Sequence, residues 1–405
     1  MTNKLAIIIG ASHAAAQLTT SLRQEGWDGD ILVIGDEPYL PYHRPPLSKT
    51  FLSGDKTVDD LLIRPAAFYE KNHIQFKQGR VTAINRAQQT LSLSDGTQLN
   101  YDKLALCMGA RVRKASIVGE ELAGVHYLRN IADVKGIQPY VAKDKRAVII
   151  GGGYIGLETA AALRKQGMDV VVLEMADRIL QRVTAPELSE FYTRIHREEG
   201  VAIHTSISVR AITGDGRAEK VVCADGVAFP ADLVIIGVGV LPNVELAQEA
   251  GIEVDNGIIV DEFCRTNDAN IVAAGDCANH FNAIYGRRMR LESVPNASEQ
   301  GKTAAATLCG LTKAYKSLPW FWSDQYDLKL QIAGLSQGYD QVVVRGDKLN
   351  SRSFAAFYFK EGRLIAADCI NRPQEFMLSK KIIMESIVIE ASRLADEAIL
   401  VKELL

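Results

Sequence analysis

Short runs of apolar, β-branched residues recur along this sequence, separated by glycine-rich turns and by stretches with helical spacing. The clearest case is the apolar run at residues 147–150, which leads directly into the glycine-rich hexapeptide 151–156. A stretch with helical spacing follows at residues 157–163, and a second apolar run, residues 169–173, ends on Glu174. Apolar runs of this length are typical of buried parallel strands, so the pattern predicts a strand–turn–helix–strand unit.

The glycines of this unit fit a loop that binds the pyrophosphate of a dinucleotide. Gly151 permits a tight turn, Gly153 lets the backbone approach the phosphates, and Gly156 lets the helix pack closely on the strand. The N-terminus of the following helix directs free N–H groups at the phosphates. Glu174 ends the second strand, where a carboxylate accepts hydrogen bonds from a ribose. Because these features occur in register, they predict nucleotide binding rather than a chance glycine-rich turn.

The same pattern occurs at the beginning of the chain. Residues 5–9 form an apolar run, residues 10–15 the turn, and a helix is expected to about residue 24. The next strand, residues 31–34, precedes the acids Asp36 and Glu37. Ser12 and Ala15 stand where glycines are usual, but both are small enough to preserve close packing. Two such units predict two bound dinucleotides.

Several other stretches complete the expected first part of the chain. Residues 68–81 are expected to form a helix followed by a strand, and residues 90–101 a hairpin. Four further strands are expected at residues 104–110, 233–243, 257–261 and 270–276. The runs at 104–110 and 233–243 are each expected to close a dinucleotide-binding domain. The last stretch ends in Asp276, which places a carboxylate at the edge where open α/β sheets bind ligands.

Residues 40–49 contain too many prolines for a helix interior or a central strand. One interpretation is a stiff loop that presents Arg44 and Lys49 to a ligand. The other is a solvated connector, which composition alone favours.

The pattern changes after residue 319. Four alternating segments predict an antiparallel sheet, and one apolar segment predicts a helix. They lie at residues 329–333, 341–345, 353–359, 363–367 and 380–391. This part therefore forms a smaller α+β domain with no cofactor motif of its own.

Composition narrows the classes of protein. The chain has 405 residues, enough for two or three domains, and its net charge of −3 gives no reason to expect nucleic acid or an anionic membrane as a partner. No apolar run approaches the roughly 20 residues of a membrane span, and the expected first strand leaves no room for a signal peptide. We therefore expect a cytoplasmic protein.

Cysteine usage points the same way. The six cysteines have no C-x-x-C spacing and form no zinc-like cluster with histidine, so we expect reduced thiols and no metal site. They are Cys107, Cys223, Cys264, Cys277, Cys309 and Cys369.

The ordered set of motifs resembles the two-dinucleotide flavoprotein reductases of the glutathione reductase class. Within that class it is similar to the putidaredoxin reductase family, whose members reduce the ferredoxins of Rieske-type dioxygenases and bacterial haem monooxygenases. The resemblance covers the whole chain, and its most specific parts lie at residues 44–49, 127–129, 151–158, 237–243, 275–277, 292–297 and 320–325.

The resemblance implies an α/β fold with two Rossmann-like dinucleotide-binding domains, for FAD and NAD, plus a C-terminal α+β domain. The FAD-binding domain would comprise residues 1–112 and 243–319, the NAD-binding domain residues 113–242, and the C-terminal domain residues 320–405. The partner would be a transiently bound [2Fe-2S] ferredoxin, and the protein itself a monomer or weak homodimer.

The resemblance also assigns residues to FAD. The pyrophosphate would lie on Gly10, Ser12, His13, Ala14 and Ala15. The remaining FAD contacts would be Asp36 and Glu37 at the adenosine ribose, Val81 at the adenine, Arg44 and Arg129 along the cofactor, Asp276 at the ribityl hydroxyls, Val294 at the pyrimidine edge, and Lys49 and Trp320 at the flavin ring. Core packing is the alternative for Val81, Val294 and Trp320.

For NADH the implied contacts are Gly151, Gly153, Tyr154, Ile155, Gly156, Glu174 and Gly239. The residues expected to act at the flavin are Lys49, Trp320 and Glu158. Hydride transfer between stacked cofactors needs no nucleophile or base, and none is expected. Lys49 would favour the anionic reduced flavin.

Two other functions share the fold. One is an NADH oxidase or peroxidase, but that group has a cysteine where this chain has the proline-rich segment. The other is a non-catalytic flavoprotein that uses NADH binding to switch a surface, as apoptosis-inducing factor does. Rapid NADH-dependent reduction of a ferredoxin would separate both from a reductase.

An acidic ferredoxin requires a basic docking surface despite the negative net charge. The candidates are Lys329, Arg345, Arg352, Arg372, Lys380 and Lys381, each of which is otherwise an ordinary solvated charge.

Overall fold

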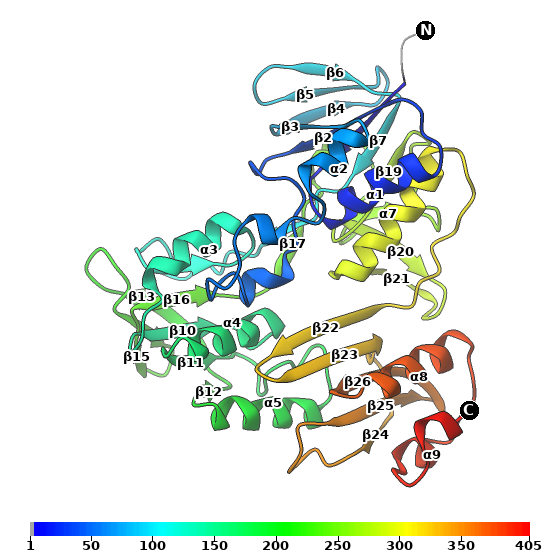
Figure 1. Cartoon of the computed structure of the whole chain (residues 1–405). Coiled ribbons are helices and arrows are strands. Elements are labelled where there is room, and N and C mark those ends of the chain that lie inside the picture. The colour runs from blue at the N-terminus through cyan, green and yellow to red at the C-terminus, as the bar shows by residue number, and fades with distance from the viewer. Residues whose placement is uncertain (1–3) are drawn as a thin grey trace. The chain divides into compact units, whose positions relative to one another are not determined.

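The computed structural model describes residues 4–405 (Figure 1). The chain forms two compact units, each assembled from segments that are distant in the sequence. The first consists of the residues up to His43 with Asp59–Arg111 and Val240–Pro319, and the second of Arg44–Val58, Val112–Gly239 and Trp320–Leu405. Residues 44–49 of the proline-rich segment therefore belong with the second unit, whereas residues 40–43 belong with the first. The three-domain boundaries expected above stay a prediction.

A five-stranded parallel sheet forms the centre of the first unit, with the strand order β19-β7-β1-β2-β3. These strands are β1 (Leu5–Ile9), β2 (Asp30–Gly35), β3 (Ile74–Gln78), β7 (Lys103–Leu106) and β19 (Ile271–Ala273). Helices α1 (His13–Gln24) and α7 (Val294–Leu308) pack side by side, and their apolar faces share one core with the sheet (Figure 1). The inner strands β7, β1 and β2 are largely apolar because both faces of the sheet are covered there, whereas the edge strand β3 alternates apolar with polar residues.

Smaller elements complete the first unit. They are the antiparallel sheet β4 (Val81–Asn85), β5 (Thr90–Leu93) and β6 (Gln98–Asn100), the sheet β18 (Ile258–Val260), β20 (Ala278–Asn282) and β21 (Arg287–Arg290), helices α2 (Ala66–Lys71) and α6 (Glu245–Glu249), and the 3₁₀ turn Asp59–Leu61. Strands β8 (Ala110–Val112) and β17 (Val240–Pro242) pair with each other.

The second unit repeats the arrangement with a parallel sheet of order β12-β11-β10-β16-β9. The strands are β9 (Val125–Tyr127), β10 (Arg146–Ile150), β11 (Asp169–Leu173), β12 (Ala202–His204) and β16 (Leu233–Ile236). In both sheets the strand before the glycine loop is central, and the acid-terminated strand lies beside it. The helices are α3 (Ile131–Ile137), α4 (Tyr154–Lys165) and α5 (Pro186–Glu198), with 3₁₀ turns at Pro45–Ser48 and Gln138–Tyr140 and a small sheet β13 (Val209–Thr213), β14 (Lys220–Cys223) and β15 (Ala228–Pro230).

The C-terminal part of the second unit is a five-stranded antiparallel sheet of order β22-β23-β26-β25-β24. Its elements are β22 (Trp320–Gln325), β23 (Leu328–Gly334), β24 (Gln341–Arg345), β25 (Phe354–Lys360), β26 (Arg363–Ile370), α8 (Pro373–Met384), α9 (Ala391–Ala395) and the 3₁₀ turn Val401–Glu403. The helix expected at residues 380–391 is wrong in position, because α8 begins at Pro373 and ends before residue 385. Proline is favoured in the first turn of a helix, and Pro373 therefore marks where α8 begins.

Two parallel sheets plus an antiparallel C-terminal sheet confirm the predicted α/β fold class. Within residues 4–405, no helix is long and apolar enough to cross a membrane.

A buried polar cluster joins the C-terminal sheet to the loop before α5. Asp368 of β26 is 1% exposed, and its Oδ2 accepts hydrogen bonds from Tyr358 at 2.6 Å and from Thr184 at 2.7 Å. The Tyr358 hydroxyl also lies 3.0 Å from that of Thr184. Burial raises the pKa of Asp368 from 3.8 to about 6, because desolvation outweighs the two donated hydrogen bonds.

This cluster predicts a pH-dependent contribution to stability. A carboxyl whose pKa is raised by folding stabilises the folded state below about pH 4, and that contribution is lost as the pH rises through about 6. Asp368→Asn keeps an acceptor oxygen without the charge. The variant should therefore gain stability relative to the wild type between pH 4 and pH 7, by up to about 3 kcal/mol. Thermal unfolding of both proteins across this range measures the difference; a difference that does not change with pH would contradict the assignment.

Candidate functional site

The first glycine loop joins β1 to α1. Gly10 has a φ of 103°, and a Cβ there would lie 2.1 Å from the carbonyl oxygen of Cys107, so no other residue fits. Ser12 is the N-cap residue of α1, and within the described structure its side chain does not cap the helix. The first turn of α1 thus keeps N–H groups without intrahelical partners, which suits an anion such as a pyrophosphate.

The next residues of this loop mainly serve packing. Ala14 and Ala15 are buried in the core beneath the first turn of α1. His13 is also buried, and its ring centroid lies 5.4 Å from that of His43. The structure thus gives His13, which the resemblance assigns to the pyrophosphate, a packing partner.

The other first-unit candidates follow strands of the same parallel sheet or begin neighbouring elements. Asp36 and Glu37 follow β2; Asp36 is exposed, and Glu37 accepts a hydrogen bond of 2.5 Å from Tyr42. Asp276 comes after β19. Because the carboxyl ends of parallel strands share one edge, these acids and the glycine loop lie along the same side of the sheet.

Two apolar candidates differ in their exposure. Val81 begins β4, is 9% exposed and belongs to the apolar core, which favours the packing alternative. Val294 is the first residue of α7 and is partly exposed, so its backbone lies at a helix start as expected.

The second glycine loop, between β10 and α4, begins with the same kind of positive-φ glycine as the first. Gly151 has a φ of 114°, and a Cβ there would lie 2.3 Å from the carbonyl oxygen of Gly237. A Cβ at Gly156 would lie 2.2 Å from the carbonyl oxygen of Gly151, so the helix packs tightly against the loop.

Gly153 differs from the other loop glycines. Its φ is −81°, and among residues 4–405 nothing lies within 4 Å of a Cβ placed there. The polypeptide itself therefore does not require glycine at this position. Space beside the backbone at the start of a helix fits a pyrophosphate group.

Glu174 closes this loop from the end of β11. Its Oε2 accepts a hydrogen bond from the Gly152 N–H at 2.6 Å, and its Oε1 accepts one from the Ala176 N–H at 2.8 Å. The carboxylate is therefore held by the glycine loop itself, with lone pairs left for ribose hydroxyls.

The remaining nucleotide candidates surround the same loop. Tyr154 begins α4, its ring centroid lies 5.1 Å from that of Phe321, and burial raises the pKa of its hydroxyl well above its usual value. Ile155 is 47% exposed. Gly239 follows β16 with a φ of 103°, and its carbonyl accepts a hydrogen bond from the Arg113 N–H.

Glu158 lies one turn further along α4 and is the centre of a buried ion pair. It is 5% exposed, and its Oε2 lies 2.7 Å from Lys49 Nζ and accepts a 2.6 Å hydrogen bond from Ser48 Oγ. Its Oε1 accepts a 2.7 Å hydrogen bond from Ser323 Oγ of β22. One carboxylate thus ties α4, the proline-rich segment and the C-terminal sheet together within the second unit.

The proline-rich segment is ordered by these contacts. It forms a 3₁₀ turn at Pro45–Ser48, and Lys49, whose side chain is 18% exposed, ends that turn. Arg44 Nη1 donates a 2.8 Å hydrogen bond to the backbone oxygen of Arg129. The segment is therefore a fixed element of the second unit, and the solvated-connector interpretation is wrong.

Trp320 begins β22 and is partly exposed. Its ring centroid lies 5.6 Å from that of Trp322 and 5.8 Å from that of Phe376, and Lys380 Nζ lies 5.3 Å from the Trp320 centroid. It is thus held by aromatic neighbours without being fully buried, which suits a ring that stacks on a ligand.

Sequence reasoning missed several residues around Glu158. Ser48, Ser323, Gln325 and His196 are all buried, and they satisfy the carboxylate or one another with hydrogen bonds. A signal existed in β22, where two polar residues spaced by two occupy the inward face of a strand.

The cysteines do not form a redox centre. All six lie in the described part of the chain and are free thiols. Burial raises the pKa of Cys277 to about 11 and that of Cys107 well above its usual value, so both are protonated at neutral pH. Among residues 4–405 no cluster of His, Cys, Asp and Glu could hold a metal ion.

The structure contradicts one of the six docking candidates, and two others are engaged in ion pairs, so their docking role stays a prediction. Arg345 is 4% exposed and donates to the backbone oxygens of Leu394 and Ile399, so it is a structural residue. Arg352 pairs with Glu199, and Arg372 with Glu375 and Glu397. Lys329, Lys380 and Lys381 remain as candidates.

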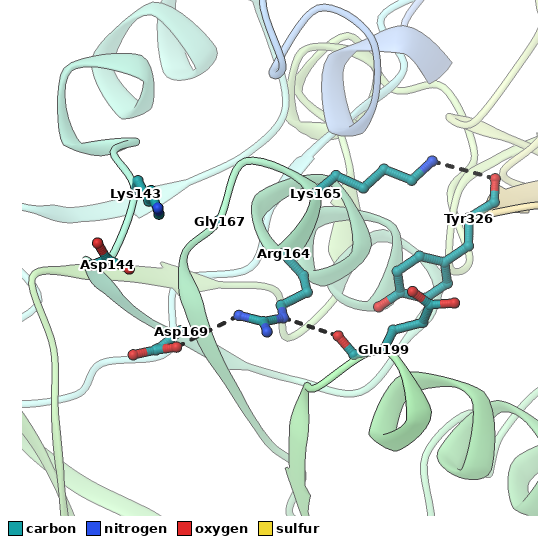
Figure 2. A pocket seen from close by; sticks show the side chains of 8 residues that line it. All are labelled: Lys143, Asp144, Arg164, Lys165, Gly167, Asp169, Glu199 and Tyr326. Carbon is teal, nitrogen blue, oxygen red and sulfur yellow. Dashed lines mark hydrogen bonds and ion pairs between the residues drawn. The ribbon is translucent and has the colours of Figure 1, made fainter.

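A polar hollow of about 370 Å³ lies elsewhere in the second unit (Figure 2). Its lining includes Lys143, Asp144, Arg164, Asp169, Glu199 and Tyr326. Asp169 is the first residue of β11, so the hollow lies at the amino edge of the parallel sheet, opposite the glycine loop. It is therefore not the nucleotide site.

Comparison with known proteins gives full-length matches. Residues 5–301 match the family described as pyridine nucleotide-disulphide oxidoreductase, and residues 320–405 match the reductase C-terminal family. The putidaredoxin reductase of Pseudomonas putida is 44% identical over 410 residues, covering 100% of this chain and 97% of that protein. The ferredoxin–NAD⁺ reductase component of the anthranilate 1,2-dioxygenase system of Burkholderia cepacia is 41% identical and covers 98% of each.

Solved structures agree with these relatives. The putidaredoxin reductase chain of a covalent putidaredoxin reductase–putidaredoxin complex matches with a TM-score of 0.97 and 43% identity, covering 100% of this chain and 98% of that one. A ferredoxin reductase from Rhodopseudomonas palustris matches with a TM-score of 0.96 and 41% identity, covering 99% of each chain. As predicted from its motifs, this chain belongs to the pyridine nucleotide-disulphide oxidoreductase family, in the group with the reductase C-terminal region.

Proposed function

We propose that this chain is an NADH-dependent flavoprotein reductase that passes electrons singly to a [2Fe-2S] ferredoxin serving a bacterial haem monooxygenase or Rieske dioxygenase. The observation that carries the proposal is the full-length likeness to reductases named for such partners, one of them in a covalent complex with putidaredoxin. When bound, FAD accepts the hydride of NADH and releases the two electrons one at a time, so one NADH serves two ferredoxins.

The first unit carries the groups that FAD requires. The backbone of Gly10 and the first turn of α1 hold the pyrophosphate, Asp36 with Glu37 binds the adenosine ribose, and Asp276 binds the ribityl hydroxyls. Support comes from their common position along the carboxyl edge of one parallel sheet. Val81 contributes mainly packing beneath this site.

The second unit carries the groups that NADH requires. The loop from Gly151 to Gly156 holds its pyrophosphate, with Tyr154, Ile155 and Gly239 around it, and Glu174 binds the adenosine ribose. The open space beside Gly153 supports this assignment, because a chain without a ligand there has no need of that glycine.

Three side chains of the second unit act at the flavin ring. Lys49 stabilises the negative charge of the reduced ring, and Glu158 fixes the position of its ammonium group. Trp320 covers the ring and excludes water. Arg129 contacts the FAD phosphate or ribityl region, and Arg44, which donates a hydrogen bond to the Arg129 backbone oxygen, lies near the ring with Lys49. This division of labour needs no thiol, in agreement with the buried, protonated cysteines.

Coenzyme choice tests the role of Glu174. The 2′-phosphate of NADPH would lie against this carboxylate, and Arg178, the nearby cation, is occupied by Thr184 and Ser189. A repulsive contact and a lost hydrogen bond cost roughly 2–4 kcal/mol, so NADH should be preferred by about a hundredfold or more in kcat/KM. Glu174→Ala should reduce the ratio of kcat/KM for NADH to kcat/KM for NADPH, mostly by lowering the value for NADH. Comparable kcat/KM values for both coenzymes in the wild type would contradict the assignment.

Ferredoxin reduction tests the proposed function. The purified protein should be yellow with one bound FAD, and with NADH it should reduce a [2Fe-2S] ferredoxin rapidly. Charge steering makes the ferredoxin rate fall with rising salt, whereas reduction of a small neutral dye should change little. Lys381→Glu should slow only the ferredoxin reaction, and Lys71→Glu, an exposed lysine of the first unit, is the matched control. Colourless protein, or flavin that NADH reduces without onward transfer to any ferredoxin, would reject the proposal.

A further inference from the structure

A line of buried polar side chains leads from Glu158 to the polar hollow. Ser323 Oγ is bonded to Glu158 at 2.7 Å, and Gln325 Nε2 lies 3.2 Å from Ser323 Oγ. His196 Nε2 lies 2.8 Å from Gln325 Oε1. The hydroxyl of Tyr326 lies 3.1 Å from His196 Nδ1. Tyr326 lines the hollow, where it is labelled in Figure 2.

This line of hydrogen-bonded side chains is inaccessible to solvent over most of its length. Ser323 and His196 are 0% exposed, Gln325 is 2% exposed and Glu158 is 5% exposed. Ser323 and Gln325 are two residues apart on β22 and so share its inward face, whereas His196 comes from α5. Buried polar atoms require partners, so the donors and acceptors along this line must match one another.

The carboxylate fixes the direction of every bond. A carboxylate only accepts, so Ser323 must donate its proton to Glu158. The Ser323 oxygen then accepts from the Gln325 amide nitrogen, which turns the Gln325 oxygen towards His196. His196 must therefore carry its proton on Nε2, and its Nδ1 accepts from Tyr326.

The opposite set of hydrogen-bond directions would leave Glu158 without its donor from Ser323. If His196 carried its proton on Nδ1, Gln325 would turn its nitrogen towards Nε2 and its oxygen towards Ser323. Ser323 would then donate to Gln325 and present only lone pairs to Glu158. Burial lowers the pKa of His196 to about 4, so at neutral pH the ring has one proton and must adopt one of these two tautomers.

We propose that Gln325, His196 and Tyr326 are positioning residues that hold the Ser323 hydroxyl as a donor to Glu158, and through it fix the Glu158–Lys49 pair. The inference rests on the proposed function, in which Lys49 lies beside the flavin. This line of side chains orients the Ser323 hydroxyl. It does not conduct protons, because the Gln325 amide does not release a proton at neutral pH. Its outer end is the Tyr326 hydroxyl at the hollow.

The histidine tautomer tests the direction of the chain without reference to the flavin. The sequence contains 7 histidines, so ¹⁵N-histidine labelling with two-bond ¹H–¹⁵N spectra can resolve them, and His196→Gln assigns the signal of interest. The wild type should show a neutral His196 protonated on Nε2 at pH 7. Gln325→Leu breaks the link to Glu158 and should leave a mixture of tautomers, whereas Tyr326→Phe keeps that link and should leave the ring protonated on Nε2. A wild-type ring protonated on Nδ1 would overturn the proposal.

The flavin reports whether the chain positions Lys49 or merely stabilises the fold. Gln325→Leu should lower the limiting rate of flavin reduction by NADH about three- to tenfold, the scale of one hydrogen bond, with little change in KM. The midpoint potential of the bound flavin should become more negative, because Glu158 is then less well neutralised. Tyr326→Phe keeps its ring packing and should give a smaller change in the same direction.

Tyr358→Phe is the matched control, because it opens the separate buried cluster around Asp368 in the same unit. It should lower the unfolding temperature without changing the flavin potential or the limiting rate. If Gln325→Leu likewise lowers the unfolding temperature but changes neither the flavin potential nor the limiting rate, these side chains are only structural and the proposal fails. Protein that binds no flavin would instead reject the proposed function, and the His196 spectrum would still decide the direction of the chain.

Discussion

One buried carboxylate holds the second unit together. Glu158 lies in the buried part of α4, where an uncompensated charge costs several kcal/mol. Lys49, Ser48 and Ser323 compensate it, and they come from segments more than 100 residues away. The proline-rich segment and the C-terminal sheet are therefore bound to the dinucleotide-binding sheet by the electrostatic requirement of one side chain. Removal of Lys49, Ser48 or Ser323 would leave the buried charge with one partner fewer. The same carboxylate therefore holds all three segments in place.

A second constraint is steric and occurs twice. In each parallel sheet the first glycine of the loop lies against a backbone oxygen at the end of the neighbouring strand. These are the oxygens of Cys107, directly after β7, and of Gly237, directly after β16. The same close approach leaves the start of a helix open to an anion in both units. The loops differ where Ser12 replaces the glycine that Gly153 provides. The close approach of the first glycine is therefore common to both loops although their sequences differ.

Much of this fold could be predicted from local patterns, because strand periodicity and glycine spacing are properties of neighbouring residues. The strand Gln341–Arg345 coincides with its expected range, and the helix at His13–Gln24 ends where expected but begins within the expected turn. Contacts between distant segments could not be predicted. Arg345 reads as a surface charge, yet it is buried against backbone oxygens, and nothing near His196 in the sequence indicates its bond to Gln325. The site was therefore predictable at its loops and not at its buried polar core.

The central claim is that Glu158 and Lys49 act as one unit at the flavin, and a double-mutant cycle tests it most directly. The limiting rate of flavin reduction by NADH is measured for the wild type, Lys49→Met, Glu158→Gln and the double variant. If the pair is a unit, each single change slows the step and the double variant is no slower than the slower single one, so the effects are strongly non-additive. Independent effects that multiply in the double variant would contradict the account.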